Sequence, residues 1–342
     1  MKCSVVILNW NGEAMLRQYL PSVLAHTQIP DVEIVVADNG STDGSLDFLR
    51  TQAVRIIALD QNYGFAEGYN RAIAQVDSEY VVLLNSDVEV TPCWLDTLLK
   101  YMDSHPDVIA AQPKVLSWTS KQEFDKGQRK TICFEHAGAS GGMMDILGYP
   151  YCRGRIMSHI EDDCGQYNDV ASIFWATGAC LLTRTSVYKE LGGLDVRFFA
   201  HQEEIDLCWR MINHAQSADN VPILVVIPQS VVYHLGGGTL GYESPRKTFL
   251  NFRNNLLMLY KNLPRSHRWW IMMVRFWMDY LAALQMLVTG QKGNVKAVVQ
   301  ARCAYHKMKK EYLMLNDNKM RGYKLLTRRS IVWDYYVIGK KK

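Results

Sequence analysis

The chain lacks paired cysteines. Its eight cysteines include no CxxC pair, and several of them lie inside apolar runs. Closely spaced cysteine pairs are the usual sign of a zinc site, and disulfide frameworks belong mainly to small secreted chains. We therefore expect reduced thiols, no structural zinc and a cytoplasmic setting.

The first residues also lack the pattern of a secretion signal. The first apolar run, residues 4–8, is short and is soon followed by polar residues, whereas a signal needs a longer apolar stretch. We expect this run to form a core strand instead.

Residues 1–242 are short of positive charge. They carry 17 Lys and Arg against 29 Asp and Glu, whereas residues 243–342 carry 21 against 5. An acidic body is unsuited to the phosphates of DNA or RNA, so we expect it to bind no nucleic acid. The basic C-terminal part also holds many Trp, Phe, Tyr and Met residues, which suits anionic lipid, RNA or an acidic partner.

No long apolar run is free of charge. The strongest, residues 268–289, is about long enough to span a bilayer, but Arg275 and Asp279 lie near its middle. Three interpretations are a helix lying in the membrane interface, a buried or dimer-forming helix, and a true span. We favour the interfacial helix, with tryptophans at headgroup level and arginines reaching toward the surface.

The N-terminal 110 residues alternate strand and helix patterns. Short runs rich in Val, Leu and Ile are typical of buried parallel strands, and the segments between them have apolar residues at helical spacing. The expected strands are residues 4–8, 33–37, 54–59, 80–84 and 109–112, and the expected helices are residues 13–27, 45–52, 66–75 and 92–105. This order predicts an α/β fold with a mostly parallel central sheet and helices on both faces.

Later segments have other patterns. Residues 117–170 lose periodicity and are rich in glycine and charge, so we expect a functional or mobile loop region there. Order returns near residue 172 and continues through a helix close to residues 204–214 and strands up to residue 234. From residue 243 the pattern is helical and basic. We expect an α/β domain over 1–242 and a helical extension over 243–342.

The most informative pattern follows the expected strand at residues 80–84. Asn85, Ser86 and Asp87 come directly after it, at the edge of the sheet where open α/β folds bind ligands. Their oxygen atoms suit Mg²⁺ or Mn²⁺ carrying a phosphorylated substrate. The alternative interpretation is an ordinary turn followed by a helix cap.

Three earlier strands end in polar turns at the same edge. Carboxylates there can accept hydrogen bonds from a base or ribose, and glycines let backbone amides approach a phosphate. One such turn needs no ligand to explain it, but several at one edge favour a binding site. The residues are Asn9, Asn11, Asp38, Asn62, Gly64 and Asn70.

Four segments together carry a family resemblance: VVILNWNG, IVVADNGSTDGS, NYGFAEGYNRA and VVLLNSDVEV. The chain resembles the family 2 glycosyltransferases of GT-A fold, which is Rossmann-like, and more nearly the rhamnosyltransferase-like members that build bacterial surface polysaccharides. The resemblance covers roughly residues 3–260. It implies an inverting sugar transfer from a nucleoside diphosphate sugar to a saccharide, assisted by Mg²⁺ or Mn²⁺.

The resemblance also implies roles for the strand-end residues. Asn9, Asn11 and Asp38 would contact the nucleoside, and the residues from Asn62 through Gly64 to Asn70 would frame the diphosphate sugar. Here the chain departs from the family, because Asn85 replaces the first acid of the commoner Asp-x-Asp motif.

Two further residues belong to the implied metal site. An amide is a weaker, neutral ligand, so Asp87 is the expected metal ligand. Asn85 and Ser86 are expected beside it, in contact with the sugar donor. His234, at the end of a later apolar run, would complete the metal site or contact the diphosphate together with the glycines that follow it. A hydrogen-bonded turn histidine is the alternative.

Glu203, Glu204 and Asp206 resemble the family's Glu-Asp-x-Asp-Leu segment. The second acid of that segment is the usual candidate for general base, and Glu204 stands there, one methylene longer than aspartate. A carboxylate must take the acceptor hydroxyl's proton, while a metal and amides hold the leaving diphosphate. Glu203 is our second choice of base, and Asp206 suits a structural or substrate-orienting role. The alternative is an acidic first helical turn.

Trp175 and Gly178 resemble the family's acceptor-side strand. Trp175 can stack on a sugar face, or it can be a core residue. Arg246, Arg253 and Asn254 fit either a contact with phosphate or lipid, or a solvated charged face. We expect acceptor specificity to lie in residues 117–170.

The sequence therefore predicts an inverting glycosyltransferase in bacterial cell-envelope polysaccharide synthesis, peripheral at the inner face of the plasma membrane, with a saccharide or lipid-linked saccharide acceptor. One alternative is a sugar nucleotidyltransferase, which would want a basic glycine-rich loop after the first strand, and residues 9–12 lack one. The other is a noncatalytic module that binds nucleotide sugars or glycans, for which Glu204 would be dispensable.

Overall fold

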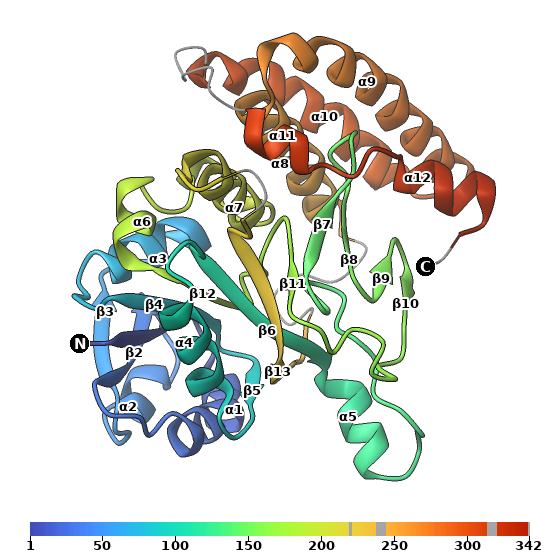
Figure 1. Ribbon diagram of the computed structural model, residues 1–342. Helices are drawn as coiled ribbons and strands as arrows, with labels where there is room; N and C mark the ends of the chain where they lie inside the picture. Colours follow the sequence, from blue (N-terminus) through green and yellow to red (C-terminus); the bar gives the residue numbers. More distant parts are fainter. Residues whose placement is uncertain (219–220, 237–243, 313–319, 341–342) are drawn as a thin grey trace.

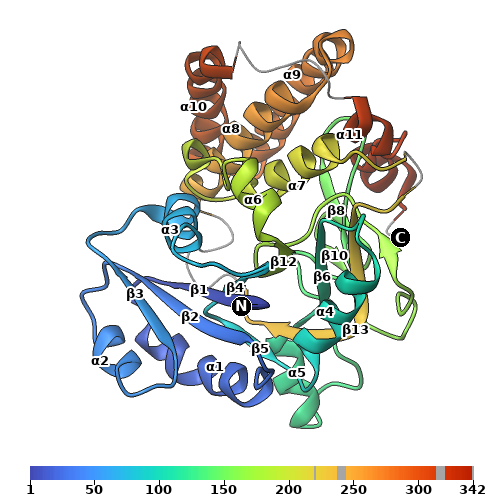
Figure 2. The same cartoon turned by 60° about the vertical axis from the view of Figure 1, so that its left-hand side comes forward.

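A computed structural model of the chain, drawn in Figures 1 and 2, describes residues 1–218, 221–236, 244–312 and 320–340. Its centre is a sheet of nine strands. The strand order is β11-β13-β6-β12-β4-β1-β2-β3, and β5 pairs with β13. The strands are β1 (Cys3–Asn9), β2 (Val32–Asn39), β3 (Arg55–Leu59), β4 (Tyr80–Asn85), β5 (Val88–Val90), β6 (Ala110–Ser117), β11 (Ala171–Ser172), β12 (Cys180–Arg184) and β13 (Leu224–His234).

Most of this sheet is parallel. The pairs β1–β2, β1–β4, β2–β3 and β6–β13 are parallel, and β12 runs antiparallel between β4 and β6. β13 is one strand with a bulge between Ile227 and Val231, where the sequence suggested two strands. The expected α/β class with a mostly parallel sheet is confirmed.

The sheet separates two hydrophobic cores, because side chains alternate along each strand. In β1, Val6 belongs to one core and Val5 and Ile7 to the other. The first core is covered by α3 (Gly64–Ile73), α6 (Thr185–Glu190) and α7 (Glu203–His214), and the second by α1 (Glu13–His26), α2 (Ser45–Leu49) and α4 (Trp94–Ser104). Helices therefore lie on both faces, as expected.

Residues 117–170 form structure of their own instead of one long loop. They contain α5 (Trp118–Asp125) and a small antiparallel sheet made of β7 (Gly142–Met144), β8 (Pro150–Cys152), β9 (Arg155–Ile156) and β10 (His159–Ile160). Gly142 lies so close to Trp175 that an added Cβ would be 2.1 Å from its ring. Strands of two or three residues are too short to show a period, which explains why the sequence suggested a loop.

The C-terminal part is helical, as expected. It contains α8 (Pro245–Asn262), α9 (Arg265–Val288), α10 (Lys292–Met308), a 3₁₀ turn η2 (Lys309–Tyr312), α11 (Met320–Leu325), α12 (Ile331–Trp333) and a π turn η3 (Asp334–Ile338). Figures 1 and 2 show α8, α9 and α10 stacked beyond α7, at the opposite end of the molecule from α1 and α2. The predicted boundary between residues 242 and 243 lies outside the described residues.

Candidate active site

The first two donor turns are joined by the pairing of β1 and β2. Asn9 and Asp38 are register neighbours in these parallel strands, and Asn9 Nδ2 donates to Asp38 Oδ2 at 3.0 Å. Asn11 Oδ1 accepts from the backbone N–H of Thr42 at 2.7 Å. Asn9 Oδ1 is buried and has no hydrogen-bond partner in the described part of the chain. The turns thus come together as predicted, and one buried acceptor atom among them is unpaired.

Asn62 and Gly64 shape the third turn. Asn62 Oδ1 accepts from the Gly64 N–H at 2.8 Å and from Asn39 Nδ2 at 3.1 Å. Gly64 has a φ of +77°, and an added Cβ would lie 3.1 Å from the Phe199 ring, so glycine permits this close approach. Asn39 was missed from the sequence, although its place next to Asp38 at the end of β2 was a usable signal.

Asn70 lies in α3 and serves a different contact. Its Nδ2 donates to the carbonyl of Leu194 at 2.8 Å, and its Oδ1 accepts from Leu194 N and from the Tyr188 hydroxyl at 2.9 and 2.7 Å. The side chain therefore fastens α3 to the segment before α7. A contact between Asn70 and the donor stays a prediction.

Asp87 and His234 meet because β5 pairs with the end of β13. His234 is the register partner of Val88, and its Nε2 lies 3.1 Å from Asp87 Oδ1. Burial opposes charge on Asp87, but the bond to His234 holds the pKa of Asp87 below its usual value. Burial alone would lower the pKa of His234, but the hydrogen bond to Asp87 and the nearby Glu135 carboxylate raise it to about 10. The sequence placed these two residues at one site without showing how they meet.

Glu135 is a member of this group that the sequence did not reveal. It is buried, its Oε2 lies 3.6 Å from His234 Nδ1, and it accepts from the backbone N–H of Ala137. Its only signal was an acid beside His136 at the end of a short apolar run. The imidazole of His234 therefore lies between two carboxylates, Asp87 on one nitrogen and Glu135 on the other.

The donor atoms near Asp87 fit a divalent cation that arrives with a diphosphate. Among the described residues no cluster of three or more His, Cys, Asp or Glu side chains is arranged to hold a metal. Asp87 Oδ1 and His234 Nε2, 3.1 Å apart, would supply two ligand atoms once a cation displaces the proton that His234 holds between them. Mg²⁺ is commonly held by one or two carboxylates together with substrate phosphates and water. Asn85 is the last residue of β4 and Ser86 separates it from Asp87, and the backbone N–H of Asn85 donates to the Ala179 carbonyl at 3.0 Å.

We expect Glu135 to orient His234 for metal binding, because groups that bond a ligating histidine fix its tautomer and ring orientation. Glu135→Gln should weaken Mn²⁺ binding in the presence of a nucleoside diphosphate by about 10- to 100-fold, measured by calorimetry. The matched control is Glu161→Gln, which changes another buried carboxylate of the same region that bonds Tyr167 and Gln166. Equal Mn²⁺ affinity in both variants would contradict this role.

A strained loop leads into α7. Phe199, His201 and Gln202 have positive φ angles of 67°, 69° and 74°, which non-glycine residues rarely adopt. Asn254 of α8 holds the loop, because its Nδ2 donates to the carbonyls of Phe198, Ala200 and His201 at 2.8–2.9 Å. Such strain persists only where surrounding contacts enforce it, and it is concentrated at functional sites.

Arg253, next to Asn254 in α8, bonds the same loop. Its guanidinium donates to the Phe198 carbonyl at 2.9 Å. These contacts place Arg253 and Asn254 in support of the loop before α7, a role that the sequence did not suggest.

Two carboxyl groups that each have one unpaired, buried oxygen begin α7. The Oε2 atoms of Glu203 and Glu204 are buried without a hydrogen-bond partner in the described residues. Burial raises the pKa of Glu204 to about 7. Burial and the charge of Glu204 raise the pKa of Glu203 well above its usual value. A carboxyl that titrates near neutral pH is suited to act as a general base.

Asp206, one turn later, is a fully paired carboxylate. It accepts from Arg210 at 2.8 Å, Lys261 at 2.7 Å and Asn262 at 2.7 Å. Despite its burial, Lys261 and Arg210 lower its pKa. These bonds tie α7 to α8 and favour the structural role for Asp206.

Gly178 connects the acids of α7 to the end of β4. An added Cβ on Gly178 would lie 3.7 Å from Cβ of Glu204, and the neighbouring Ala179 is the backbone partner of Asn85. Trp175 is 3% exposed, and its Nε1 donates to the Met143 carbonyl at 2.9 Å. The structure favours the core interpretation of Trp175 and places Gly178 beside the base candidates.

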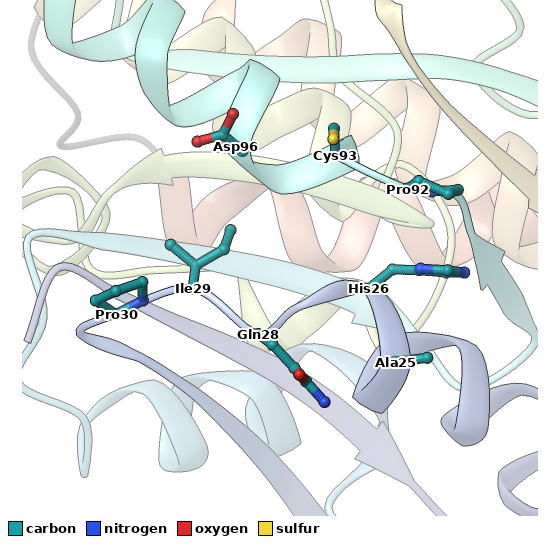
Figure 3. A pocket seen from close by; sticks show the side chains of 8 residues that line it. All are labelled: Ala25, His26, Gln28, Ile29, Pro30, Pro92, Cys93 and Asp96. Carbon is teal, nitrogen blue, oxygen red and sulfur yellow. The ribbon is translucent and has the colours of Figure 1, made fainter.

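A hollow of about 250 Å³ adjoins the Asp87–His234 pair and is lined by Ser117, Thr119, Phe134, Glu135, His136, Ile160, Leu235 and Gly236. Another, of about 400 Å³, lies between the end of α1 and the start of α4 (Figure 3). The second hollow is remote from this group, whereas the first includes Glu135 and Leu235, the neighbour of His234, so we place the chemistry near the first. Residues 237–239 of the predicted glycine-rich stretch lie outside the described residues.

Solved structures share this architecture. The structure of S. aureus TarS 1-349 with UDP-GlcNAc has a TM-score of 0.56 and 15% identity, covering 98% of this chain and 91% of that one. The mannosyltransferase PcManGT of Pyrobaculum calidifontis with GDP-Man and Mn²⁺ has a TM-score of 0.54 and 14% identity, covering 97% and 87%. A longer TarS structure is matched over 42% of its length. These likenesses show that the chain has the GT-A fold.

Sequence comparison finds similarity to glycosyltransferases. Residues 4–153 match the model described as "Glycosyl transferase family 2". It is 25% identical to the N-acetylglucosaminyl-diphospho-decaprenol L-rhamnosyltransferase of Mycobacterium tuberculosis, over 78% of this chain and 85% of that protein. It is 27% identical to the O-antigen biosynthesis protein RfbC of Myxococcus xanthus, over 68% of this chain but only 17% of that protein. The predicted recognition is confirmed, and this assignment speaks against both alternative functions.

Proposed function

We propose that the protein transfers a hexosyl or rhamnosyl group, with inversion, from a nucleoside diphosphate sugar to a saccharide carried on a lipid diphosphate. The observation that carries this proposal is the buried Glu204 carboxyl, which has one unpaired oxygen and a pKa raised to about 7. It lies next to Gly178, and the neighbouring Ala179 bonds Asn85 at the end of the strand before Asp87. The name of the mycobacterial relative supports a lipid-linked acceptor and a deoxyhexose donor. A place in surface polysaccharide synthesis is supported by the O-antigen relative.

Glu204 accepts the proton in the proposed reaction. As the acceptor hydroxyl oxygen forms a bond to the anomeric carbon, the bond from that carbon to the diphosphate oxygen breaks, and its electron pair leaves with the diphosphate. The hydroxyl proton passes to the Glu204 carboxylate. A single attack from the face opposite the leaving group inverts the anomeric centre, and no covalent sugar–enzyme bond forms. Glu203 keeps the alternative role of base.

Asp87 and His234 would hold the divalent cation, whose charge offsets that developing on the departing diphosphate. Mg²⁺ and Mn²⁺ both suit this pair of oxygen and nitrogen ligands. Asn9 and Asp38 would bind the nucleoside, and the unpaired Asn9 Oδ1 is an available acceptor. The turns at Asn11 and Asn62 shape the walls of the cradle.

The proposed setting is the cytoplasmic face of a bacterial plasma membrane, where lipid-linked acceptors are available. We propose that the acceptor enters from the side of residues 117–170, because the hollow of about 250 Å³ beside His234 is lined largely by that region. Gly178 would leave room for the acceptor next to Glu204.

Donor binding can be tested separately from catalysis. With a panel of nucleoside diphosphate sugars at about 100 times Kd, the correct donor should add about 2.7 kcal/mol of stability when Mg²⁺ or Mn²⁺ is present. Asp87→Ala should abolish the metal-dependent part of this stabilisation, measured by thermal unfolding. The control is Asp96→Ala, an acid in the hollow of Figure 3 that bonds Lys100 at the surface.

Product analysis then tests the transfer itself. The proposal expects a transferred sugar with the opposite anomeric configuration, seen by NMR. Donor binding without turnover on any saccharide or lipid-linked acceptor would instead indicate a binding module, and a retained configuration would contradict direct inversion.

A further inference from the structure

Helix α9 buries charged side chains and exposes apolar ones, the reverse of an ordinary surface helix. Its buried positions recur once per turn and include two charged residues, Arg275 and Asp279. Its outer side is apolar from Trp269 to Leu284, whereas a surface helix normally turns its apolar stripe inward. The exposed apolar residues are Trp269, Met273, Val274, Phe276, Trp277, Tyr280, Leu281, Leu284, Leu287 and Val288.

The charged side of α9 is fully engaged inside the protein. Arg275 donates to the Leu147 carbonyl at 3.0 Å and to Asn255 of α8. Asp279 accepts from Arg275 at 3.2 Å and from Arg302 of α10. The expectation that the arginine in this run reaches out to the surface is therefore wrong for Arg275, which is 2% exposed. Between Trp269 and Leu284 every exposed residue of α9 is apolar or aromatic.

A second exposed apolar group lies near α9. Trp333, Tyr336, Val337 and Ile338 are each more than half exposed. The turn between β7 and β8 connects the two groups, because Asp145 accepts from the Ile331 N–H at 3.0 Å and Leu147 accepts from Arg275. Figures 1 and 2 show these helices at the end of the molecule away from α1 and α2.

We propose that this outer face of α9 docks on a bilayer that contains anionic lipid, with the helix lying in the plane of the interface. Tryptophan and tyrosine are enriched at the headgroup level of membranes. Residues 243–342 carry 21 Lys and Arg against 5 Asp and Glu, and α10 exposes Lys292, Lys296 and Lys307 beside α9. Apolar insertion combined with basic residues is the pattern of interfacial helices.

Charge favours lipid over a second copy of the chain as the occupant of this face. Two such faces brought together would oppose two strongly basic segments, and like charges across an interface are unfavourable. An anionic surface is instead attracted by them. α9 is long and apolar enough to cross a membrane, but its charged side bonds α8, α10 and the β7–β8 turn, so in this arrangement it lies on the bilayer.

The docking face is connected to the catalytic helix through α8. Asn255 bonds Arg275 of α9, and its neighbour Asn254 holds the strained loop before Glu203 and Glu204. This connection gives the docked protein a fixed orientation of its active site relative to the membrane. The consequence rests on the proposed lipid-linked acceptor, whereas membrane binding itself does not.

The test is flotation of the full chain with vesicles of phosphatidylcholine, either alone or with about 30% phosphatidylglycerol. The wild type should bind the anionic vesicles and bind them less at high salt. Trp277→Glu with Leu281→Glu should lower binding by roughly tenfold or more without a change in melting temperature, because both side chains are already exposed. The control is Phe124→Glu, an exposed aromatic residue of α5 that lies outside this face.

Three outcomes would overturn the proposal. They are no binding of the wild type to anionic vesicles, equal binding of the double variant, and a wild-type dimer in light scattering that the double variant breaks while neither binds vesicles. Transfer to a water-soluble acceptor, measured in the same variants, should stay unchanged. That assay reports on the proposed reaction alone, so failure of docking and failure of the reaction are distinguishable.

Discussion

Replacing Glu204 with glutamine is expected to lower kcat by about 10²- to 10⁴-fold, the usual contribution of a positioned general base. Glutamine keeps the size of the side chain but cannot take a proton from the acceptor hydroxyl. Donor affinity should change little, because Glu204 is assigned to the acceptor and not to the diphosphate. Steady-state transfer kinetics and donor binding by calorimetry separate these two effects.

The kcat of the wild-type enzyme should depend on pH in a direction that the pKa of Glu204 fixes. Burial raises the pKa of Glu204 to about 7, and only the ionised form is a base. Wild-type kcat should therefore rise with pH through about 7, and the residual activity of Glu204→Gln should lose that rise. The comparison variant is Glu203→Gln, which removes the neighbouring carboxyl. If Glu203→Gln costs as much activity as Glu204→Gln and also removes the pH step, Glu203 is the base instead.

Asp206→Ala is expected to destabilise the protein by about 3–5 kcal/mol, because it removes one of the two carboxylates that compensate a buried lysine. Lys261 is buried and lies 2.7 Å from Asp206 and 2.8 Å from Asp195. The same substitution also removes one hydrogen bond each from Arg210 and Asn262. Urea unfolding measures the loss, and the control is Asp47→Ala, an exposed acid paired with Arg50, which should cost about 1 kcal/mol or less.

The free energy of unfolding at acid pH should also depend on Asp206. The folded pKa of Asp206 lies below 3.8, since Lys261 and Arg210 outweigh the effect of burial. Its stabilisation is therefore present above that ordinary value and is lost as pH falls through the lower folded pKa. Asp206→Ala should be less sensitive to this acid range than wild type. If Asp206→Ala lowers the free energy of unfolding by well under about 1 kcal/mol, the structural role assigned to Asp206 is contradicted.

The sheet and the donor edge could be predicted because they depend on local pattern and on one topological rule. Short apolar runs identified the strands, and parallel strands place their carboxyl ends at one edge. That rule placed Asn9 and Asp38 at the same edge of the sheet, and the register shows that they are neighbours there. Asp87 and His234 were predicted to share a site on family resemblance, and the pairing of β5 with β13 supplies the physical reason.

Other features depend on contacts between distant parts of the chain. Glu135 reaches His234 across 99 positions of sequence, and no local pattern marks it. Asn254 appeared as one polar residue in a basic helix, and its function follows only from the three carbonyls that it bonds. The different pKa values of Glu204 and Asp206 depend on burial and on Lys261, a residue 55 positions later.

The core beneath α7 has a consequence for how the chain acquires its shape. Leu207 and Ile212 of α7 and Leu256 and Leu259 of α8 belong to the same buried cluster as Val6 of the first strand. The change from acidic to basic composition near residue 242 is therefore no boundary in folding, because both sides fill one interior. The active-site helix can reach its final position only after the last third of the chain has been synthesised and packed against it, so a nascent or truncated N-terminal fragment would be an incomplete enzyme.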